Sequence, residues 1–166
     1  MKKLCSVIVA VLLLSGCGAK EPAIPIRLQE GITLSAIVQE VARQTDMPPS
    51  MTLDTSDLTA LLGLREDDLT EGIALIAENE EQGDCLLAAE AAEGKEKAVT
   101  KAMQQELRLR REDAAQNHPA LTAKAAEGRL ITEGRYFFLF ILGEGEDPAA
   151  ESDAIEETIR GYFVTE

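Results

Sequence analysis

The stretch "RYFFLFIL" (residues 135–142) restricts the possible folds of this chain more than any other segment. Successive side chains of a strand point to opposite faces. Here both sets are apolar: Tyr136, Phe138 and Phe140 on one side, Phe137, Leu139 and Ile141 on the other. A strand with two apolar faces must be buried on both. We therefore expect a central strand in a sheet that helices cover on one or both sides.

Three other short apolar runs indicate further strands. "RLIT" directly precedes the central segment, and Glu133-Gly134 between them predicts a tight hairpin turn. Earlier in the chain, Gly72–Glu78 and Asp84–Ala91 flank the turn-like sequence "NEEQG". These two runs predict a second hairpin.

The remaining apolar residues follow a helical period. Leu34, Ile37, Val38 and Val41 recur at i, i+3, i+4 and i+7 after Thr33, which can act as the N-cap. The expected helices cover residues 33–44, 54–63, 95–116, 119–128 and 153–163. The order α-α-β-β-α-α-β-β-α predicts an α+β fold, in which a mainly antiparallel four-stranded sheet packs against helices. We expect one such domain over residues 31–166.

The N-terminal segment differs from the rest of the chain. Lys2 and Lys3 precede the apolar run Leu4–Leu14, which has 11 residues. A helix of this length rises about 16 Å, roughly half of a ~30 Å hydrocarbon core. The run is therefore too short for a stable membrane span, and its layout is typical of a secretory signal peptide. An uncleaved N-terminal anchor is the alternative interpretation.

The residues after this run, Leu14, Ser15, Gly16 and Cys17, resemble the bacterial lipobox. In that motif the cysteine thiol receives a diacylglyceryl group and becomes the first residue of the mature chain. The resemblance implies that residues 1–16 are a lipoprotein signal peptide and that Cys17 carries the lipid. Residues 17–30 contain two prolines and no helical period, so we expect a tether. Two acyl chains suffice for stable anchoring, which predicts a location at the cell membrane, on its extracytoplasmic side.

The charge of the chain excludes some partners. The chain has 16 Lys and Arg against 30 Asp and Glu residues, a formal charge of −14. Removal of Lys2 and Lys3 with the signal peptide would make the mature charge −16. Nucleic-acid phosphates require Lys and Arg, so nucleic acid is not an expected partner. The expected contacts are the membrane, through the lipid on Cys17, and an envelope protein.

Cysteine and histidine offer little chemistry. After loss of Cys5 and lipidation of Cys17, Cys85 is the remaining thiol, so no intrachain disulfide is expected. Cys85 lies in the apolar run "DCLLAA", which favours a buried small hydrophobic residue. A thiol-dependent enzyme, with His118 as the base for Cys85, is an alternative. The sequence gives no catalytic residue and no cofactor, and one His with one Cys cannot form an ordinary zinc site.

Acidic residues gather in "GEGEDPAAESD", residues 143–153, which we expect to be a turn-rich loop. Its carboxylates are Glu144, Glu146, Asp147, Glu151 and Asp153. Calcium binds such oxygen ligands, but the spacing of an EF-hand is missing. The preferred interpretation is a solvated acidic loop, and no metal ligand is assigned.

Three stretches resemble an uncharacterised family of small lipoproteins from clostridia-like bacteria, domain of unknown function 4358. They are "DDLTEGIALIAENE", "EGKEKAVTKAMQQELRLRREDAAQNHPALTAKAAEGRLITEGRYFFLFILG" and "AIEETIRGYF". Members often have Tyr where this chain has His118, before Pro119. The resemblance implies the α+β fold and an envelope location, and the family brings no known activity.

These features together predict a membrane-anchored extracytoplasmic lipoprotein that acts as a non-enzymatic binding or adaptor module. One alternative is an accessory lipoprotein of a transporter that binds a small ligand or a divalent cation. The other is the thiol-dependent enzyme that uses Cys85.

Overall fold

The computed structural model describes residues 26–143 and 147–165. The helices in these ranges are α1 (Leu34–Gln44), α2 (Thr55–Leu61), α3 (Glu96–Asn117), α4 (Thr122–Glu127) and α5 (Pro148–Arg160), with a 3₁₀ turn, η1 (Pro119–Leu121), before α4. The strands are β1 (Ile26–Leu28), β2 (Ser50–Leu53), β3 (Leu69–Ala77), β4 (Cys85–Ala91), β5 (Arg129–Glu133), β6 (Tyr136–Ile141) and β7 (Phe163–Thr165).

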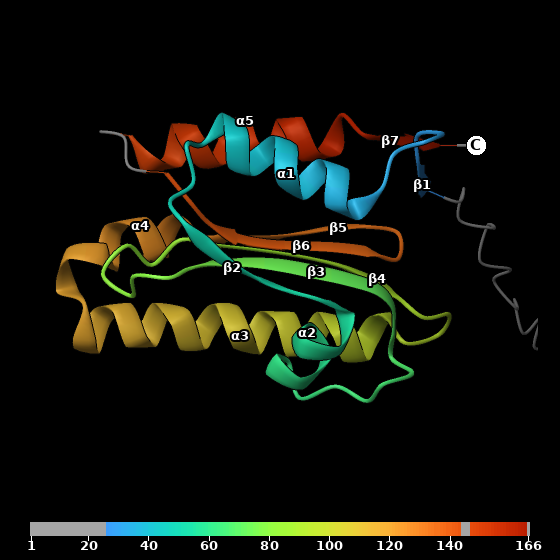
Figure 1. Cartoon of the computed structure of the whole chain (residues 1–166), viewed down its shortest axis with the longest axis horizontal. Coiled ribbons are helices and arrows are strands. Elements are labelled where there is room, and N and C mark those ends of the chain that lie inside the picture. Colours follow the sequence, from blue (N-terminus) through green and yellow to red (C-terminus); the bar gives the residue numbers. More distant parts are fainter. Residues whose placement is uncertain (1–25, 144–146, 166) are drawn as a thin grey trace, which may run out of the picture.

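The described strands form two antiparallel sheets. The larger has five strands in the order β2-β3-β4-β6-β5, and the smaller pairs β1 with β7. Figure 1 shows the large sheet between two helical layers, with α1 and α5 on one face and α2 and α3 on the other. The predicted α+β class and antiparallel pairing are confirmed, but the sheet has five strands instead of four.

Strand β6 has the predicted environment. It lies between β4 and β5, and Phe137, Phe138, Leu139 and Phe140 are fully buried. Alternate side chains enter two separate apolar clusters, one on each face of the sheet. The prediction of a strand buried on both faces is therefore correct. The turn of its hairpin is Gly134-Arg135, one residue later than expected, because Glu133 still pairs with Tyr136.

We call the side of the sheet under α2 and α3 the α3 face, and the side under α1 and α5 the α1 face. Met103 and Leu107 of α3 pack on the α3 face with Leu87, Phe137 and Leu139. Ile37 of α1 and Ile159 of α5 pack on the α1 face with Phe138 and Phe140. Alternation along the strands thus divides the core into two clusters, since each strand contributes to both.

Several predicted helix boundaries hold, but both ends of the last predicted helix are wrong. The Thr33 side chain accepts a hydrogen bond from Ala36 N, as expected of the N-cap of α1. Helix α5 begins at Pro148, not at Asp153, and it ends at Arg160, not at Phe163, which lies in β7. Asp147 is its N-cap and Pro148 occupies the first turn, a position that proline favours. Residues 148–153 are therefore helical, and the expectation of a loop over 143–153 is wrong for them.

Strand β1 changes the start of the folded domain. Ile26, Arg27 and Leu28 pair with Thr165, Val164 and Phe163 of β7. The folded unit therefore includes residues 26–30, which we expected to belong to the tether. The predicted signal peptide, the lipobox with Cys17 and the remainder of the tether lie outside the described residues. No helix of the described ranges is long and apolar enough to cross a membrane.

Candidate functional site

A cavity of about 540 Å³ opens beside the end of the sheet where the β3–β4 loop meets α3, η1 and α4. Its polar lining residues are Asn79, Glu80, Asp84, Arg110, Asp113, Asn117, His118 and Lys124. Ile76, Leu121 and Ile141 are among its apolar lining residues. This volume suits a small molecule. Eight of the fifteen lining residues are polar, so the cavity is suited to a ligand with polar groups. We call it the α3–α4 cavity.

The helical period explains how α3 reaches the cavity. Arg110, Asp113, Ala114 and Asn117 are spaced i, i+3, i+4 and i+7, so they lie on one face of the helix. Ala114 is buried against the core. The others lie beside it and can present their polar groups to the cavity.

The β3–β4 loop closes the cavity through an ion pair with α4. Lys124 Nζ lies 2.6 Å from Asp84 Oδ2, and it also donates a hydrogen bond to the carbonyl oxygen of Gln82 at 3.0 Å. The side chains of Asp84 and Lys124 are only 2% and 12% exposed. A charge-assisted hydrogen bond with so little exposure holds the loop and helix in one geometry.

The loop also depends on a glycine at its tightest point. Gly83 has a φ of +68°, and a Cβ atom there would lie 2.7 Å from Leu121 Cδ1. The backbone conformation and the contact with η1 both favour glycine at this position.

The guanidinium of Arg110 uses only its Nε in a hydrogen bond with a described residue. Its Nε donates to Glu106 Oε1 at 2.8 Å, one turn earlier on α3, and its side chain is 22% exposed. In the described part of the chain, no hydrogen bond engages its two terminal nitrogens, and no fully buried side-chain nitrogen or oxygen lacks a partner. These terminal nitrogens are therefore not fully buried. A guanidinium held at Nε with its terminal fork accessible can bind a planar anion in bidentate fashion.

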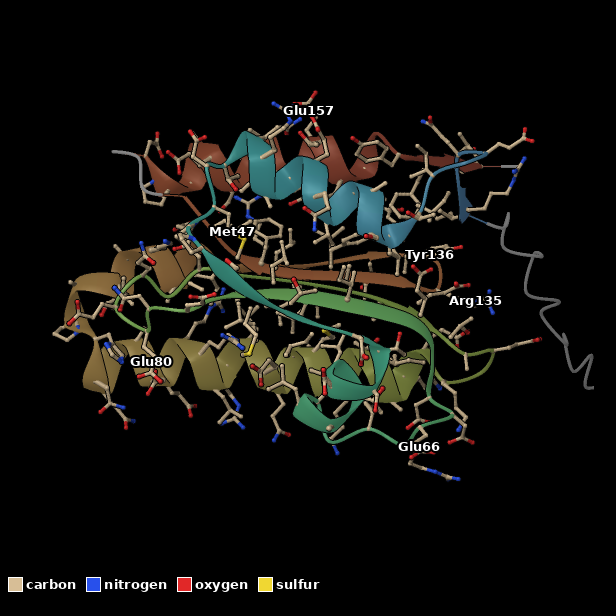
Figure 2. The ribbon with its side chains drawn as sticks, in the orientation of Figure 1. Met47, Glu66, Glu80, Arg135, Tyr136 and Glu157 are labelled. Atoms are coloured by element: carbon tan, nitrogen blue, oxygen red, sulfur yellow. The ribbon has the colours of Figure 1, made fainter. Side chains whose placement is uncertain are left out.

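Carboxylates lie at the outer edge of the cavity. Asp113 is 59% exposed, accepts a hydrogen bond from Asn117 Nδ2 at 2.6 Å, and lies 3.9 Å from His118 Nε2. Glu80 is exposed on the β3–β4 loop, and Figure 2 shows it beside α3. The charged lining thus combines the cations Arg110 and Lys124 with the buried carboxylate of Asp84 and the two exposed ones of Glu80 and Asp113.

The structure gives separate environments to the two residues of the thiol hypothesis. Cys85 is fully buried in β4, and burial raises the pKa of its thiol. His118 lines the α3–α4 cavity, whereas Cys85 is not among its lining residues. The buried position agrees with the interpretation of Cys85 as a small hydrophobic residue. A raised pKa disfavours the thiolate, which is the reactive form.

The acidic residues of 143–153 do not share one site within the described ranges. Asp147 accepts a hydrogen bond from Ala150 N as the N-cap of α5, and Asp153 pairs with Arg129 at 2.7 Å. Glu151 lines a second cavity of about 420 Å³ with Asp46. Glu144 and Glu146 lie outside the described residues. Among the described His, Cys, Asp and Glu residues, no group of three could hold a metal ion.

The sequence did not predict the α3–α4 cavity. His118 was considered as a base for Cys85, and the acidic run 78–81, which contains Asn79 and Glu80, was interpreted as a solvated surface. Asp84 and Lys124 are 40 positions apart, so no local pattern joins them. One signal was present: the polar residues Arg110, Asp113 and Asn117 share the helix face that carries the buried Ala114. This spacing places the three polar residues next to a core position, and in the structure they line the cavity.

The comparison with known families covers this site. The family described as "Domain of unknown function (DUF4358)" matches residues 43–142. The matched range contains β2 to β6, α2 to α4 and all residues that line the α3–α4 cavity. It leaves out β1, most of α1, α5 and β7. No curated protein and no solved structure matches the chain. Because the match spans more than half of its residues, the chain belongs to the DUF4358 family.

Proposed function

We propose that this protein is an extracytoplasmic lipoprotein, anchored in the cell membrane through Cys17, that binds a small ligand in the α3–α4 cavity. One observation carries the ligand-binding part of this proposal. The guanidinium of Arg110 lines a cavity of about 540 Å³ while its terminal nitrogens keep free donors. Donors arranged in a cavity before a ligand arrives reduce the cost of binding.

The anchor is supported by the sequence and by the position of β1. Cys17 precedes Ile26 by nine residues, which span at most about 30 Å when fully extended. A lipid on Cys17 would therefore hold the folded domain close to the bilayer. Metabolic labelling with an alkyne fatty acid tests this. The wild-type chain should be labelled and sediment with membranes, and Cys17→Ala should lose both properties. An unlabelled wild-type chain in the soluble fraction would contradict the anchor.

Ligand binding is tested by the melting temperature of the full-length chain in detergent micelles. The panel should contain neutral, cationic, anionic and zwitterionic small molecules at millimolar concentration. A ligand that binds the folded state alone raises the melting temperature by mass action. If no member of the panel shifts it, the proposed binding function is wrong.

The other ligand classes have less support. Asp147 and Asp153 already have hydrogen-bonding or ionic partners, so the described acidic residues give no support to divalent-cation binding. The buried, protonated state of Cys85 likewise gives no support to thiol catalysis. These alternatives would require residues or conformations other than the ones described.

A protein partner is a second candidate, and strand β2 favours it. Among the described strands β2 pairs with β3 alone, and its Met51 side chain is 54% exposed. An exposed edge strand can accept a strand from another chain. A photo-crosslinking residue at Met51 should capture an envelope protein in intact cells, whereas the same residue at Gln105 of α3 should not. Equal crosslinking at both positions would argue against β2 as the interface.

A further inference from the structure

Resting on the proposed function, we infer that the α3–α4 cavity binds a zwitterionic amino acid with an apolar side chain. The carboxylate of the ligand contacts Arg110, its ammonium group faces Asp113 and Glu80, and its side chain contacts the apolar lining. The inference is narrower than the proposed function, because it specifies a ligand with one carboxylate, one ammonium group and an apolar side chain.

The N–H donors in the lining of the cavity favour a single carboxylate on the ligand. Lys124 donates two of its three N–H groups, to Asp84 and to the Gln82 carbonyl, so its charge is largely matched by Asp84. Glu106 pairs with the guanidinium of Arg110 through Nε at 2.8 Å, so Arg110 offers a ligand its terminal N–H groups and not an unmatched charge. One bidentate fork matches one carboxylate. A phosphate dianion would meet the same single fork and would be repelled by the acidic edge.

The outer charge of the cavity selects a positive group on the same ligand. Asp113 is already close to His118 and Asn117, but its side chain remains more than half exposed. Glu80, on the β3–β4 loop, also lines the cavity and is exposed. An ammonium group at the opening would be attracted by both carboxylates. A ligand with a carboxylate alone would leave them without this partner.

The uncharged surface of the cavity defines the ligand's side chain. Ile76 of β3, Leu121 of η1 and Ile141 of β6 line the cavity between the charged groups. Burial of an aliphatic side chain there is favourable by about 25 cal/mol for each Å² of apolar surface removed from water. An amino acid such as leucine supplies a carboxylate, an ammonium group and an apolar side chain within the available volume.

Calorimetric titration of the full-length chain in detergent micelles tests this inference with four probes. They are L-leucine, 4-methylpentanoate (which lacks the ammonium group), 3-methylbutylamine (which lacks the carboxylate) and inorganic phosphate. We expect leucine to bind, 4-methylpentanoate to bind at least about tenfold more weakly, and the other two not to bind. If phosphate or 4-methylpentanoate binds as tightly as leucine, or if leucine does not bind, the inference is overturned.

Variants locate the ligand. Arg110→Gln should weaken leucine binding at least about tenfold, and Arg110→Lys, which keeps the charge without the fork, should have an intermediate effect. Arg108→Gln is the matched control, because Arg108 pairs with Glu112 on the exposed side of the same helix. It should leave binding unchanged. Equal affinity of Arg110→Gln and Arg108→Gln for leucine would overturn the assignment of the carboxylate to Arg110.

A further variant tests the acidic edge separately. The double substitution Glu80→Gln and Asp113→Asn should weaken leucine binding but not the binding of 4-methylpentanoate, because only leucine carries the ammonium group. If both ligands lose affinity equally, the role of the edge is overturned. The proposed binding function fails separately: it is wrong only if no molecule of the broader panel binds. Binding of a neutral or simple anionic molecule at least as tightly as leucine would refute the amino-acid inference alone.

Discussion

The two faces of the sheet carry different chemistry. The α1 face holds five of the six aromatic residues of the chain: Tyr136, Phe138, Phe140, Tyr162 and Phe163. The Phe163 ring contacts those of Tyr136 and Phe138, with centroid distances of 5.4 and 6.0 Å. The α3 face holds Phe137 with alanine, leucine and methionine, and its border contains the ion pairs Asp84–Lys124, Asp68–Lys95 and Glu106–Arg110.

This difference separates stability from recognition. Large apolar side chains on the α1 face provide non-directional burial, while the polar border of the α3 face fixes groups in defined positions. The family match follows the same division, since it covers the layer of α2, α3 and α4 and leaves out most of α1 and all of α5. The α1 face thus supplies most of the aromatic burial, and the α3 face borders the cavity that we propose as the site.

Truncation of an aromatic residue on the α1 face should have the largest effect. Phe138→Ala should lower the free energy of unfolding by about 3–5 kcal/mol, because Phe138 is fully buried and contacts Phe163. Urea unfolding followed by circular dichroism measures this. Met51→Ala, at an exposed position, is the control and should cost less than about 0.5 kcal/mol. If the two variants lose similar free energies of unfolding, aromatic burial on the α1 face does not contribute the stability that we assign to it.

A change at the border of the α3 face should come next. Lys124→Met should lower the free energy of unfolding by roughly 3 kcal/mol, because it removes the ammonium group that neutralises the buried Asp84 carboxylate. Adding Asp84→Asn to this variant should recover part of the lost free energy of unfolding, because the buried negative charge of Asp84 is then removed. If the double variant is no more stable than Lys124→Met, the pair is not the source of the effect.

Arg111 sharpens the comparison, because it supports the cavity without lining it. Its guanidinium donates hydrogen bonds to the carbonyl oxygens of Ala125, Ala126 and Gly128, at the C-terminal end of α4. Arg111→Gln should cost about 1–2 kcal/mol and increase hydrogen exchange in α4 while leaving α1 protected. Arg108→Gln, three residues earlier, should change neither property. Faster exchange in both helices would show that the two layers are not independent.

The smallest expected effect concerns pH. Hydrogen bonds from Lys95 Nζ at 2.8 Å, and then from Arg65 N at 3.0 Å, lower the pKa of Asp68 from its usual 3.8. The stability that this carboxylate contributes is therefore fully present above about pH 4 and is lost as the pH falls through its lowered, folded-state pKa.

The corresponding measurement is the free energy of unfolding between pH 7 and pH 2. Asp68→Asn should show a shallower decline below pH 4 than the wild type. Asp67→Asn changes the exposed neighbouring carboxylate and should keep the wild-type slope. If the free energy of unfolding falls with the same slope in all three chains, protonation of Asp68 does not cause the loss of stability at low pH.

Local patterns predicted the parts of the fold that are set by near neighbours. Alternation in residues 135–142 identified β6, and the spacing of Leu34 to Val41 with Thr33 identified α1. Strands β1, β2 and β7 were missed because three or four residues give too short a pattern, and their pairing partners are distant in sequence. The start of α5 was missed because acidic residues and Pro148 suggest a loop until Asp147 is known to cap a helix.

The site was less predictable than the fold for the same physical reason. Arg110, Asp84 and Lys124 come from three elements, and each alone has the pattern of a solvated charge on a helix or loop. Only tertiary packing removes Asp84 and Lys124 from water and brings them together. The burial of Cys85, by contrast, followed from its apolar neighbours.

Strand β1 has a mechanical consequence for a protein held at its N-terminus. Tension transmitted along a tether from Cys17 would enter the domain at Ile26 and pass into β7 through the β1–β7 pair. Just beyond the pair, Gln29 donates its backbone and side-chain N–H groups to the carbonyl oxygens of Tyr162 and Gly161, at 2.9 and 2.7 Å. The load would thus reach the C-terminal end of α5 first. Figure 1 shows this pair at one end of the long axis, with α4 and the β3–β4 loop at the other, so a pull from the bilayer would be absorbed far from the α3–α4 cavity.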